Sequence, residues 1–189
     1  GRAILPTPVL GVVGLIAHAD RIATRVYPAS GLDVVLLGDN LGELGGSEYL
    51  NTVHGVIKGV PPALDLAREK ALHELLVELV DGGLAKSAHD CSDGGVAVTL
   101  AEGTFDSGGI GVSVELPAAS SDGGVDLVAA TLFGESASRA VISVSPANTA
   151  AVLAAAARKG VPAAKVGVTG QNAPTFAPST TPTLYWSAS

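Results

Sequence analysis

The stretch from Ala88 to Gly95, with the sequence AHDCSDGG, holds the densest cluster of reactive side chains in the chain. It contains the only cysteine, one of four histidines, two carboxylates, a hydroxyl and a glycine pair. The carboxylates of Asp90 and Asp93 offer the oxygen ligands that Mg²⁺ prefers. A glycine pair before a helix lets a phosphate approach the free backbone N–H groups of the first turn. The pattern therefore fits either a Mg²⁺–phosphate site or a helix start capped by Ser92 or Asp93.

Two other chemistries fit this stretch less well. Catalytic cysteine and histidine residues usually come from distant positions in the sequence, whereas Cys91 and His89 are nearly adjacent. Zinc sites usually show pairs of cysteines or histidines at characteristic spacing, and the chain has no second cysteine. We therefore expect Cys91 to be an inert thiol that is buried or partly buried.

Two further segments carry polar side chains that could face a ligand. In FGESASR (133–139), the side chains of Glu135, Ser136 and Arg139 cluster just before an expected strand. This cluster fits a substrate-binding loop or a solvated turn between a helix and a strand. In ELGGSEY (43–49), the glycine pair fits a ligand-facing loop or a simple helix cap. The residues alone leave both alternatives open in each segment.

The composition predicts an ordered globular chain of 189 residues with one good core. The net charge of −7 and the 11 scattered basic residues argue against nucleic-acid binding. The sequence has no apolar run of about 18 residues, so a membrane span is not expected. A single cysteine fits a reducing, cytoplasmic setting. The chain begins with Gly1-Arg2 and has no methionine, from which we expect a trimmed chain or a fragment.

The hydrophobic pattern predicts helices that alternate with strands. Strands are expected at Val9–Ile16, Leu32–Asp39, Ile110–Leu116, Arg139–Ser145, 163–170 and 184–186. Helices are expected from a Ser47 cap to Gly55, over Pro62–Val80, from Gly95 to about Glu102, within 125–136 and over Pro146–Arg158. We infer an α+β fold in which helices pack on a mixed sheet.

Five motifs occur in an order that resembles one enzyme family. They are PTPVLGVVG (6–14), LGELGGSEYL (41–50), PPALDLAREKALHELL (61–76), AHDCSDGGVAVTLAE (88–102) and LFGESASRAVISV (132–144). Together they closely resemble the C-terminal part of phosphoribosylformylglycinamidine synthase, in the synthetase subunit of the small bacterial type. The resemblance runs over nearly the whole chain, and five motifs in register are far more specific than a lone glycine-rich signal.

This resemblance implies a role in purine biosynthesis. Enzymes of the family are ATP-dependent C–N ligases that convert formylglycinamide ribonucleotide to the amidine. ATP activates the amide oxygen of the substrate, and ammonia then displaces the phosphate. The ammonia comes from a separate glutaminase subunit, and a small accessory subunit helps assembly. The same superfamily includes aminoimidazole ribonucleotide synthetase and selenophosphate synthetase.

The resemblance also implies a division of the chain. Residues 1–32 match the tail of the second ATP-binding-type domain plus a linker, and residues 33–189 match the second C-terminal-type domain. The family's catalytic histidine lies in the first half of the enzyme, and the ATP- and Mg²⁺-binding residues of the second half fall upstream of Gly1. We therefore expect no turnover by this chain alone. Its expected role is to scaffold the upstream half of the same polypeptide, or to hold an auxiliary nucleotide.

Four residues can be matched to sites of the family. In the large single-chain relatives, the Asp of the H-D-x-S-D-G-G motif ligates the Mg²⁺ of an auxiliary ATP or ADP, and the Ser contacts that nucleotide. These positions match Asp90 and Ser92, although the large type has Arg at Cys91. By internal pseudo-symmetry, Glu135 and Ser136 match the substrate-binding loop of the first half. Gln commonly follows this Ser, and this chain departs from that pattern, so we expect a degenerate site.

Two other hypotheses remain open from the sequence. The chain could be a non-catalytic assembly or binding module that uses its sheet for partner contacts. It could also belong to another ATP-dependent enzyme of the superfamily, such as aminoimidazole ribonucleotide synthetase or a kinase relative. The pairing of LGGSEYL with AHDCSDGG favours the purine synthetase over the second of these.

Overall fold

Strands that are far apart in the sequence pair to form one sheet. The computed structural model describes residues 10–16, 18–120, 126–170 and 183–186. Its strands are β1 (Asp33–Leu37), β2 (Ala85–Asp90), β3 (Gly111–Glu115), β4 (Ala140–Val144), β5 (Ala163–Gly170) and β6 (Thr183–Trp186). Their order across the sheet is β2-β4-β1-β5-β3-β6.

Every pairing in this sheet is antiparallel. The α+β class is confirmed, but the expected mixed sheet is wrong for the described strands. Parallel neighbours usually arise from βαβ units, in which a helix joins two adjacent strands. Here no two strands that are consecutive in the sequence are neighbours in the sheet, so no such unit forms among them.

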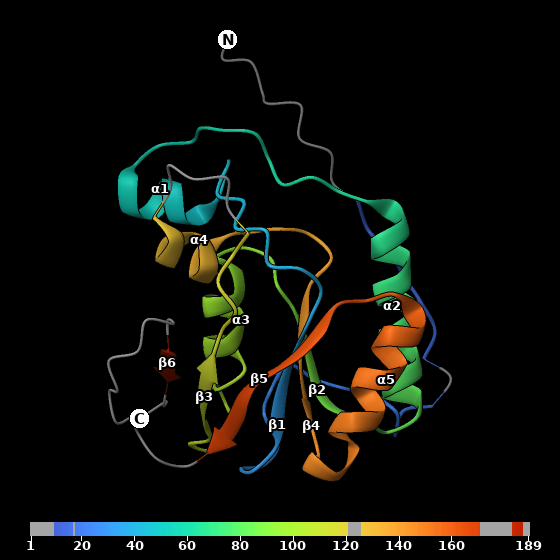
Figure 1. The fold of residues 1–189 in the computed structure, drawn as a ribbon. Coiled ribbons are helices and arrows are strands. Elements are labelled where there is room, and N and C mark those ends of the chain that lie inside the picture. The colour runs from blue at the N-terminus through green and yellow to red at the C-terminus, as the bar shows by residue number, and fades with distance from the viewer. Residues whose placement is uncertain (1–9, 17, 121–125, 171–182, 187–189) are drawn as a thin grey trace.

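Helices cover both faces of the sheet and produce three layers. The helices are α1 (Glu48–His54), α2 (Leu66–Asp81), α3 (Gly95–Glu102), α4 (Leu127–Phe133) and α5 (Thr149–Lys159), with a 3₁₀ turn at Pro146–Asn148. Figure 1 shows α2 and α5 on one face and α3 and α4 on the other, with α1 next to α4. Alternate residues of β1 serve the two faces, because successive side chains of a strand point in opposite directions. Val34 and Leu36 pack in the core beneath α3, whereas Val35 and Leu37 pack beneath α2 and α5.

The prediction for α1 is confirmed at both ends. The Ser47 hydroxyl accepts a hydrogen bond from the backbone N–H of Leu50 at 3.3 Å, and Gly55 ends the helix in the left-handed conformation. A side-chain cap at the start and a glycine at the end depend only on nearby residues, so both ends of the helix could be predicted from the sequence.

The prediction for α2 is wrong at its start. The helix begins at Leu66 rather than at Pro62, and the Asp65 carboxylate accepts hydrogen bonds from the N–H groups of Ala67 and Arg68. An aspartate cap satisfies first-turn N–H groups that a proline start would leave free. The prolines belong instead to the exposed segment before the helix.

Two strand predictions also need correction. The strand expected over Val9–Ile16 is wrong for residues 10–16, which have no regular secondary structure and are exposed, while Val9 lies outside the described residues. A strand requires a hydrogen-bonded neighbour, and none of the described residues pairs with this segment. Conversely, β2 was not expected, because its sequence AKSAHD has no apolar alternation; it becomes a strand by pairing with β4. None of the helices in the described part of the chain is long and apolar enough to cross a membrane.

Candidate functional site

Three connecting segments meet at one end of the sheet. The strand register places the end of β1 at Leu37 and the end of β2 at Asp90 opposite the same residue, Ala140, which begins β4. The segments that adjoin these three positions therefore lie together. They are residues 38–47, residues 91–94 and the turn 134–139. This end of the sheet thus collects all three motifs in which the sequence predicted a ligand site or a cap.

Glu135 joins the turn to two helices. Its Oε1 accepts a hydrogen bond from the backbone N–H of Gly94 at 2.8 Å and another from that of Glu48 at 2.9 Å. Gly94 precedes α3, and Glu48 is the first residue of α1. An anionic oxygen is favourable there, because helix N-termini carry free N–H groups and partial positive charge.

Ser136 is fully buried and serves the neighbouring segment. Its Oγ accepts a hydrogen bond from the backbone N–H of Glu43 at 3.3 Å, and the N–H of Glu135 donates to the carbonyl oxygen of Glu43 at 2.8 Å. The side chains of the two residues that the sequence placed in a substrate loop therefore accept hydrogen bonds from backbone N–H groups within the protein.

Arg139 lies beneath the turn, with only 2% of its surface exposed. Its guanidinium donates to the carbonyl oxygens of Ser136 at 2.8 Å and Gly134 at 2.6 Å, and to Oδ1 of Asn40 at 2.9 Å. Burial lowers the pKa of this guanidinium, and the nearby Cys91, Glu43 and Glu135 oppose that effect. Arg139 thereby fixes the turn to the segment that follows β1.

Asp90 and Ser92 lie on the surface at the same end of the sheet. The side chain of Asp90 is 76% exposed and meets Nδ1 of His89 at 3.2 Å, and Ser92 is exposed. The expected cap by Ser92 or Asp93 is wrong, because α3 begins after Gly94 without a side-chain cap. The Glu135 carboxylate bonds the Gly94 N–H instead, and that contact is invisible in the local sequence.

Cys91 is buried, as expected for an inert thiol. Burial raises the pKa of this thiol, while the charge of Arg139 and a hydrogen bond from Thr99 act to lower it. Because the thiolate is the nucleophile, a raised pKa and a buried sulfur both argue against covalent catalysis.

A groove of about 550 Å³ runs beside these residues. Its lining includes Asp90, Cys91, Ser138, Arg139 and His73 of α2. Within the described residues, three metal-ligating side chains nowhere come together. The exposed Asp90 carboxylate could still serve a Mg²⁺ ion whose other ligands are phosphate oxygens and water, which is how proteins commonly bind this ion.

Comparison with protein families gives a match over most of the chain. The model described as "AIR synthase related protein, C-terminal domain" matches residues 29–175. The chain belongs to this family.

The chain is similar to parts of longer proteins. It is 45% identical over 168 residues to phosphoribosylformylglycinamidine synthase subunit PurL of Moorella thermoacetica, covering 89% of the chain and 22% of that protein. The PurL of Anaeromyxobacter sp. (strain Fw109-5) is 42% identical over 179 residues, covering 90% of the chain and 23% of the relative. The predicted resemblance is thus confirmed, and the chain spans less than a quarter of the length of these curated relatives.

Solved structures agree on the fold of the AIR synthase-related domain. Thermotoga maritima PurL complexed with FGAR has a TM-score of 0.64 and 23% identity, covering 80% of the chain and 26% of that protein. The PurLQS structure from Thermotoga maritima has a TM-score of 0.63 and 21% identity, covering 82% of the chain and 25% of that protein. A thiamine-monophosphate kinase from Stenotrophomonas maltophilia has a TM-score of 0.51 and 17% identity, covering 79% of the chain and 51% of the kinase. At these identities the likeness shows the fold alone.

Sequence reasoning on the AIR synthase-related domain missed two residues of this region. Asn40 receives Arg139 and itself donates from Nδ2 to the carbonyl oxygen of Thr131 at 2.9 Å. Glu43 binds the N–H of Ala63 through Oε1 at 2.9 Å. Glu43 opens the ELGGSEY segment that the sequence singled out, but the residue itself was not named. The signal for Asn40 was its position three residues after a buried strand, where polar side chains often line a site.

Proposed function

We propose that this chain is the C-terminal part of an ATP-dependent C–N ligase of purine biosynthesis, in the step from formylglycinamide ribonucleotide to its amidine. The observation that carries the proposal is 45% identity over 168 residues to a PurL protein. That similarity covers 89% of the chain, whereas fold alone is shared with a kinase at 17% identity. Fold does not imply function, so the high identity is the stronger support.

The local role of this part is proposed to be scaffolding together with an auxiliary nucleotide site. Asp90 would hold Mg²⁺ and Ser92 would contact the phosphates of ATP or ADP. Both side chains are exposed, and Asp90 lines the groove, which supports this assignment. Glu135 and Ser136 would form a degenerate substrate loop, which is supported by their internal hydrogen bonds.

The remaining parts of the reaction are proposed to lie elsewhere. The catalytic histidine and the main ATP site would belong to an upstream half of the same polypeptide. A glutaminase subunit and a small accessory subunit would be the partners, in a cytoplasmic complex. The similarity to the structure titled PurLQS from Thermotoga maritima supports a multi-subunit setting.

A purely structural assembly module is the second candidate function. Large apolar side chains are exposed along residues 10–16 and 56–66, including Leu15, Ile57 and Val60. Exposed apolar surface of this extent usually marks an interaction site.

A chimera tests the ligase assignment. The matching region of the Moorella thermoacetica PurL would be replaced by this chain, and amidine formation would be measured with ammonia. We expect activity within about tenfold of the parent enzyme, and none from this chain alone. As a matched control, the corresponding domain of the thiamine-monophosphate kinase should give a folded but inactive chimera. A folded, inactive chimera with this chain would overturn the ligase assignment.

Calorimetric titration tests the nucleotide site. Mg²⁺-ADP would be added to the chimera and to its Asp90→Ala, Ser92→Ala and Asp93→Ala variants. Loss of saturable binding in the first two variants only is the expected result. Asp93→Ala removes the same charge from the same loop, so equal loss in all three would indicate a nonspecific charge effect.

A further inference from the structure

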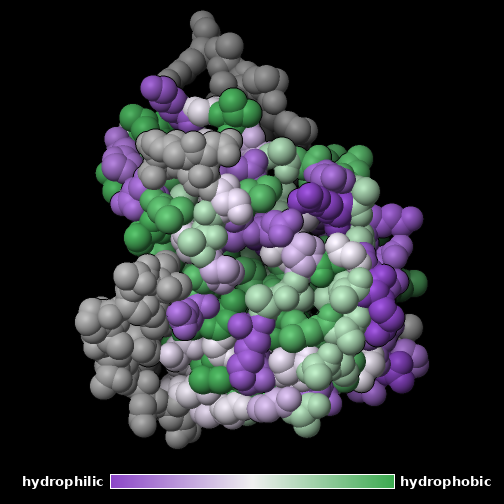
Figure 2. Space-filling model, in the orientation of Figure 1, coloured by the Kyte–Doolittle hydropathy of each residue, from purple (hydrophilic) through white to green (hydrophobic). Residues whose placement is uncertain are grey.

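Residues 55–65, called the strap here, cross the top of the molecule between α1 and α2 (Figure 1). All of these residues except Pro62 are exposed. Ile57 and Val60 are each 84% exposed and Leu64 is 61% exposed. Figure 2 shows hydrophobic groups along this edge of the molecule. The strap thus presents large apolar side chains to water, which costs free energy unless they are covered.

Two tethers hold the strap to the body of the protein. The backbone N–H of Gly46 donates to the carbonyl oxygen of Lys58 at 2.8 Å. The backbone N–H of Ala63 donates to Oε1 of Glu43 at 2.9 Å. Between these tethers, the strap passes so close to residue 45 that a Cβ on Gly45 would lie 1.9 Å from the carbonyl oxygen of Val60. Gly59, with a φ of 100°, meets Gly45 at the same crossing, where a Cβ on Gly59 would lie 2.8 Å from the Cα of Gly45. Because both residues are glycines, we infer that the strap pivots at this crossing.

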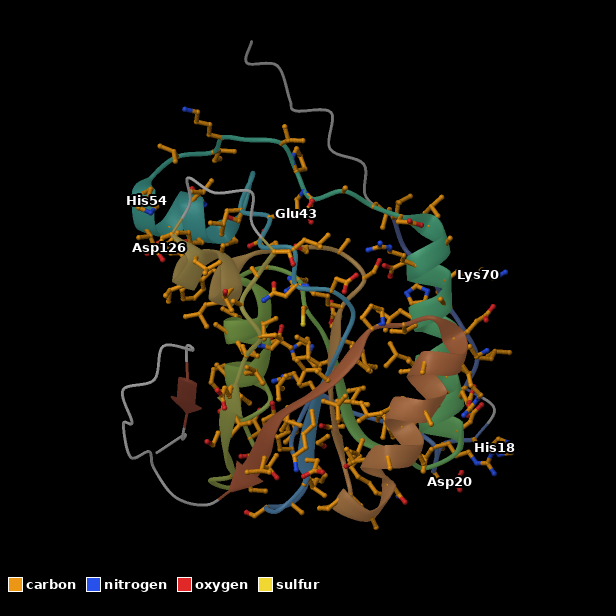
Figure 3. The ribbon with its side chains drawn as sticks, viewed as in Figure 1. His18, Asp20, Glu43, His54, Lys70 and Asp126 are labelled. Carbon is orange, nitrogen blue, oxygen red and sulfur yellow. The ribbon has the colours of Figure 1, made fainter. Side chains whose placement is uncertain are left out.

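Glu43 is only half satisfied in this position. Its Oε2 is buried without a hydrogen-bond partner among the described residues, while Oε1 holds the strap. Its backbone is clamped on both sides, because its carbonyl oxygen accepts from Glu135 and its N–H donates to Ser136. Figure 3 shows Glu43 beneath the strap in this view. A buried carboxylate oxygen without a donor is costly, so the latch favours its present position only weakly.

The strap also forms one rim of a second groove, of about 330 Å³. Ala63 and Leu64 of the strap line it together with Ser138, Gly160 and Pro162. Leu64 and Ser138 also line the groove that contains Asp90, so the two grooves are adjacent.

We propose that the strap is a lid over this groove, with Glu43 as its latch. The lid pivots at the crossing with Gly45 and closes toward Gly160, which brings Val60 and Leu64 over apolar lining and out of water. Release of Ala63 from Glu43 permits the movement. Since the backbone of Glu43 is bonded to Glu135 and Ser136, the latch also connects the lid to the turn 134–139. This inference does not require a nucleotide at Asp90.

Limited proteolysis of this chain with trypsin tests the latch. Lys58 provides a trypsin cleavage site within the strap. We expect Glu43→Ala to speed cleavage after Lys58 roughly tenfold, as loss of a hydrogen bond to a charged group should. Glu43→Gln keeps an acceptor for Ala63 and should stay within about twofold of the parent chain. Glu48→Gln changes a nearby exposed carboxylate that does not touch the strap, so its rate should equal that of the parent. Ala63→Pro removes the N–H donor at an exposed position and also restricts the backbone of residues 62 and 63. It repeats the test if Glu43→Ala does not fold.

A distance measurement tests closure. Spin labels on Val60→Cys and Arg158→Cys would report the separation across the groove by pulsed electron paramagnetic resonance, since the buried Cys91 should stay unlabelled. We expect a minor short-distance population in the parent chain that grows in the Glu43→Ala and Ala63→Pro backgrounds. One unchanged distance in all three proteins, a shift to longer distance, or equal cleavage rates for Glu43→Ala and the parent would each overturn the proposal.

Discussion

The Glu135 carboxylate and the backbone N–H of Gly94 lie 2.8 Å apart, although 41 residues separate them in the sequence. The same oxygen also accepts from the N–H of Glu48 at 2.9 Å, so one side chain serves the first turns of α1 and α3. This contact explains why α3 forms without a side-chain cap from Ser92 or Asp93. It also explains why the turn that carries Glu135 and the segment after β2 keep a fixed relation to each other.

Removing this carboxylate should destabilise the fold. Glu135→Ala removes the acceptor of two backbone donors at helix N-termini, of which the Gly94 N–H is partly buried, and we expect a loss of about 2 kcal/mol in the free energy of unfolding. Glu135→Gln keeps a neutral acceptor and should lose about half as much. Urea denaturation of both variants checks the prediction. Glu48→Ala is the control, because its side chain makes only exposed contacts with Asn51 and Thr52; equal losses for Glu48→Ala and Glu135→Ala would contradict the assignment.

The close approach of α3 to the end of α4 depends on Gly95. This residue has a φ of 66°, and an added Cβ would lie 2.5 Å from the carbonyl oxygen of Gly134. We expect Gly95→Ala to cost more than about 2 kcal/mol, because it adds a backbone clash to the cost of the left-handed conformation. Gly160→Ala is a matched control with a φ of 68° and open space, and should cost about 1 kcal/mol. Thermal unfolding distinguishes the two, and similar shifts would show that the clash is relieved.

The ion pair of Asp33 should make stability depend on pH. Burial acts to raise the pKa of this carboxyl, but hydrogen bonds from Lys165 at 2.8 Å and Thr149 at 2.6 Å outweigh it, so the pKa is lowered. A lowered folded-state pKa gives stabilisation that is present above the unfolded pKa of about 4 and is lost as the pH falls through the folded value.

Lys165→Met tests this dependence. Because Lys165 is 46% exposed, we expect a cost of only about 1 kcal/mol at pH 7 and a smaller cost near pH 3. Urea denaturation at the two pH values gives the difference. Lys70→Met, at an exposed pair on α2, should show little cost at either pH. The same cost for Lys165→Met at both pH values would contradict the prediction.

The hydroxyl of Tyr27 should contribute nothing to stability. It is buried and has no hydrogen-bond partner among the described residues, and burial together with the neighbouring Cys91 raises its pKa. Tyr27→Phe removes a buried polar group and should leave stability unchanged or raise it by up to about 1 kcal/mol. Tyr27→Ala should cost about 3 kcal/mol through the cavity it leaves. Calorimetric melting of the two variants is the measurement, and a clear loss in Tyr27→Phe would contradict the prediction.

Local signals in the sequence located several elements closely. Ser47 and Gly55 bounded α1, and the apolar run before Gly38 gave β1. The segment from Gly95 to Glu102 was placed correctly as α3. These features depend on hydrogen bonds and torsion angles within a few residues, so the chain segment itself contains the information. The motifs likewise carried the family resemblance, which depends on residue identity and order alone.

Contacts between distant segments decided the rest. Residues 10–16 have the composition of a strand but lack a described partner, whereas the polar β2 gained one in β4. The direction of each strand, the burial of Arg139 and the use of Glu135 as a cap all follow from how the segments pack against one another. Local sequence cannot specify these features, because a hydrogen bond or a buried charge is stabilised only after folding brings both partners together.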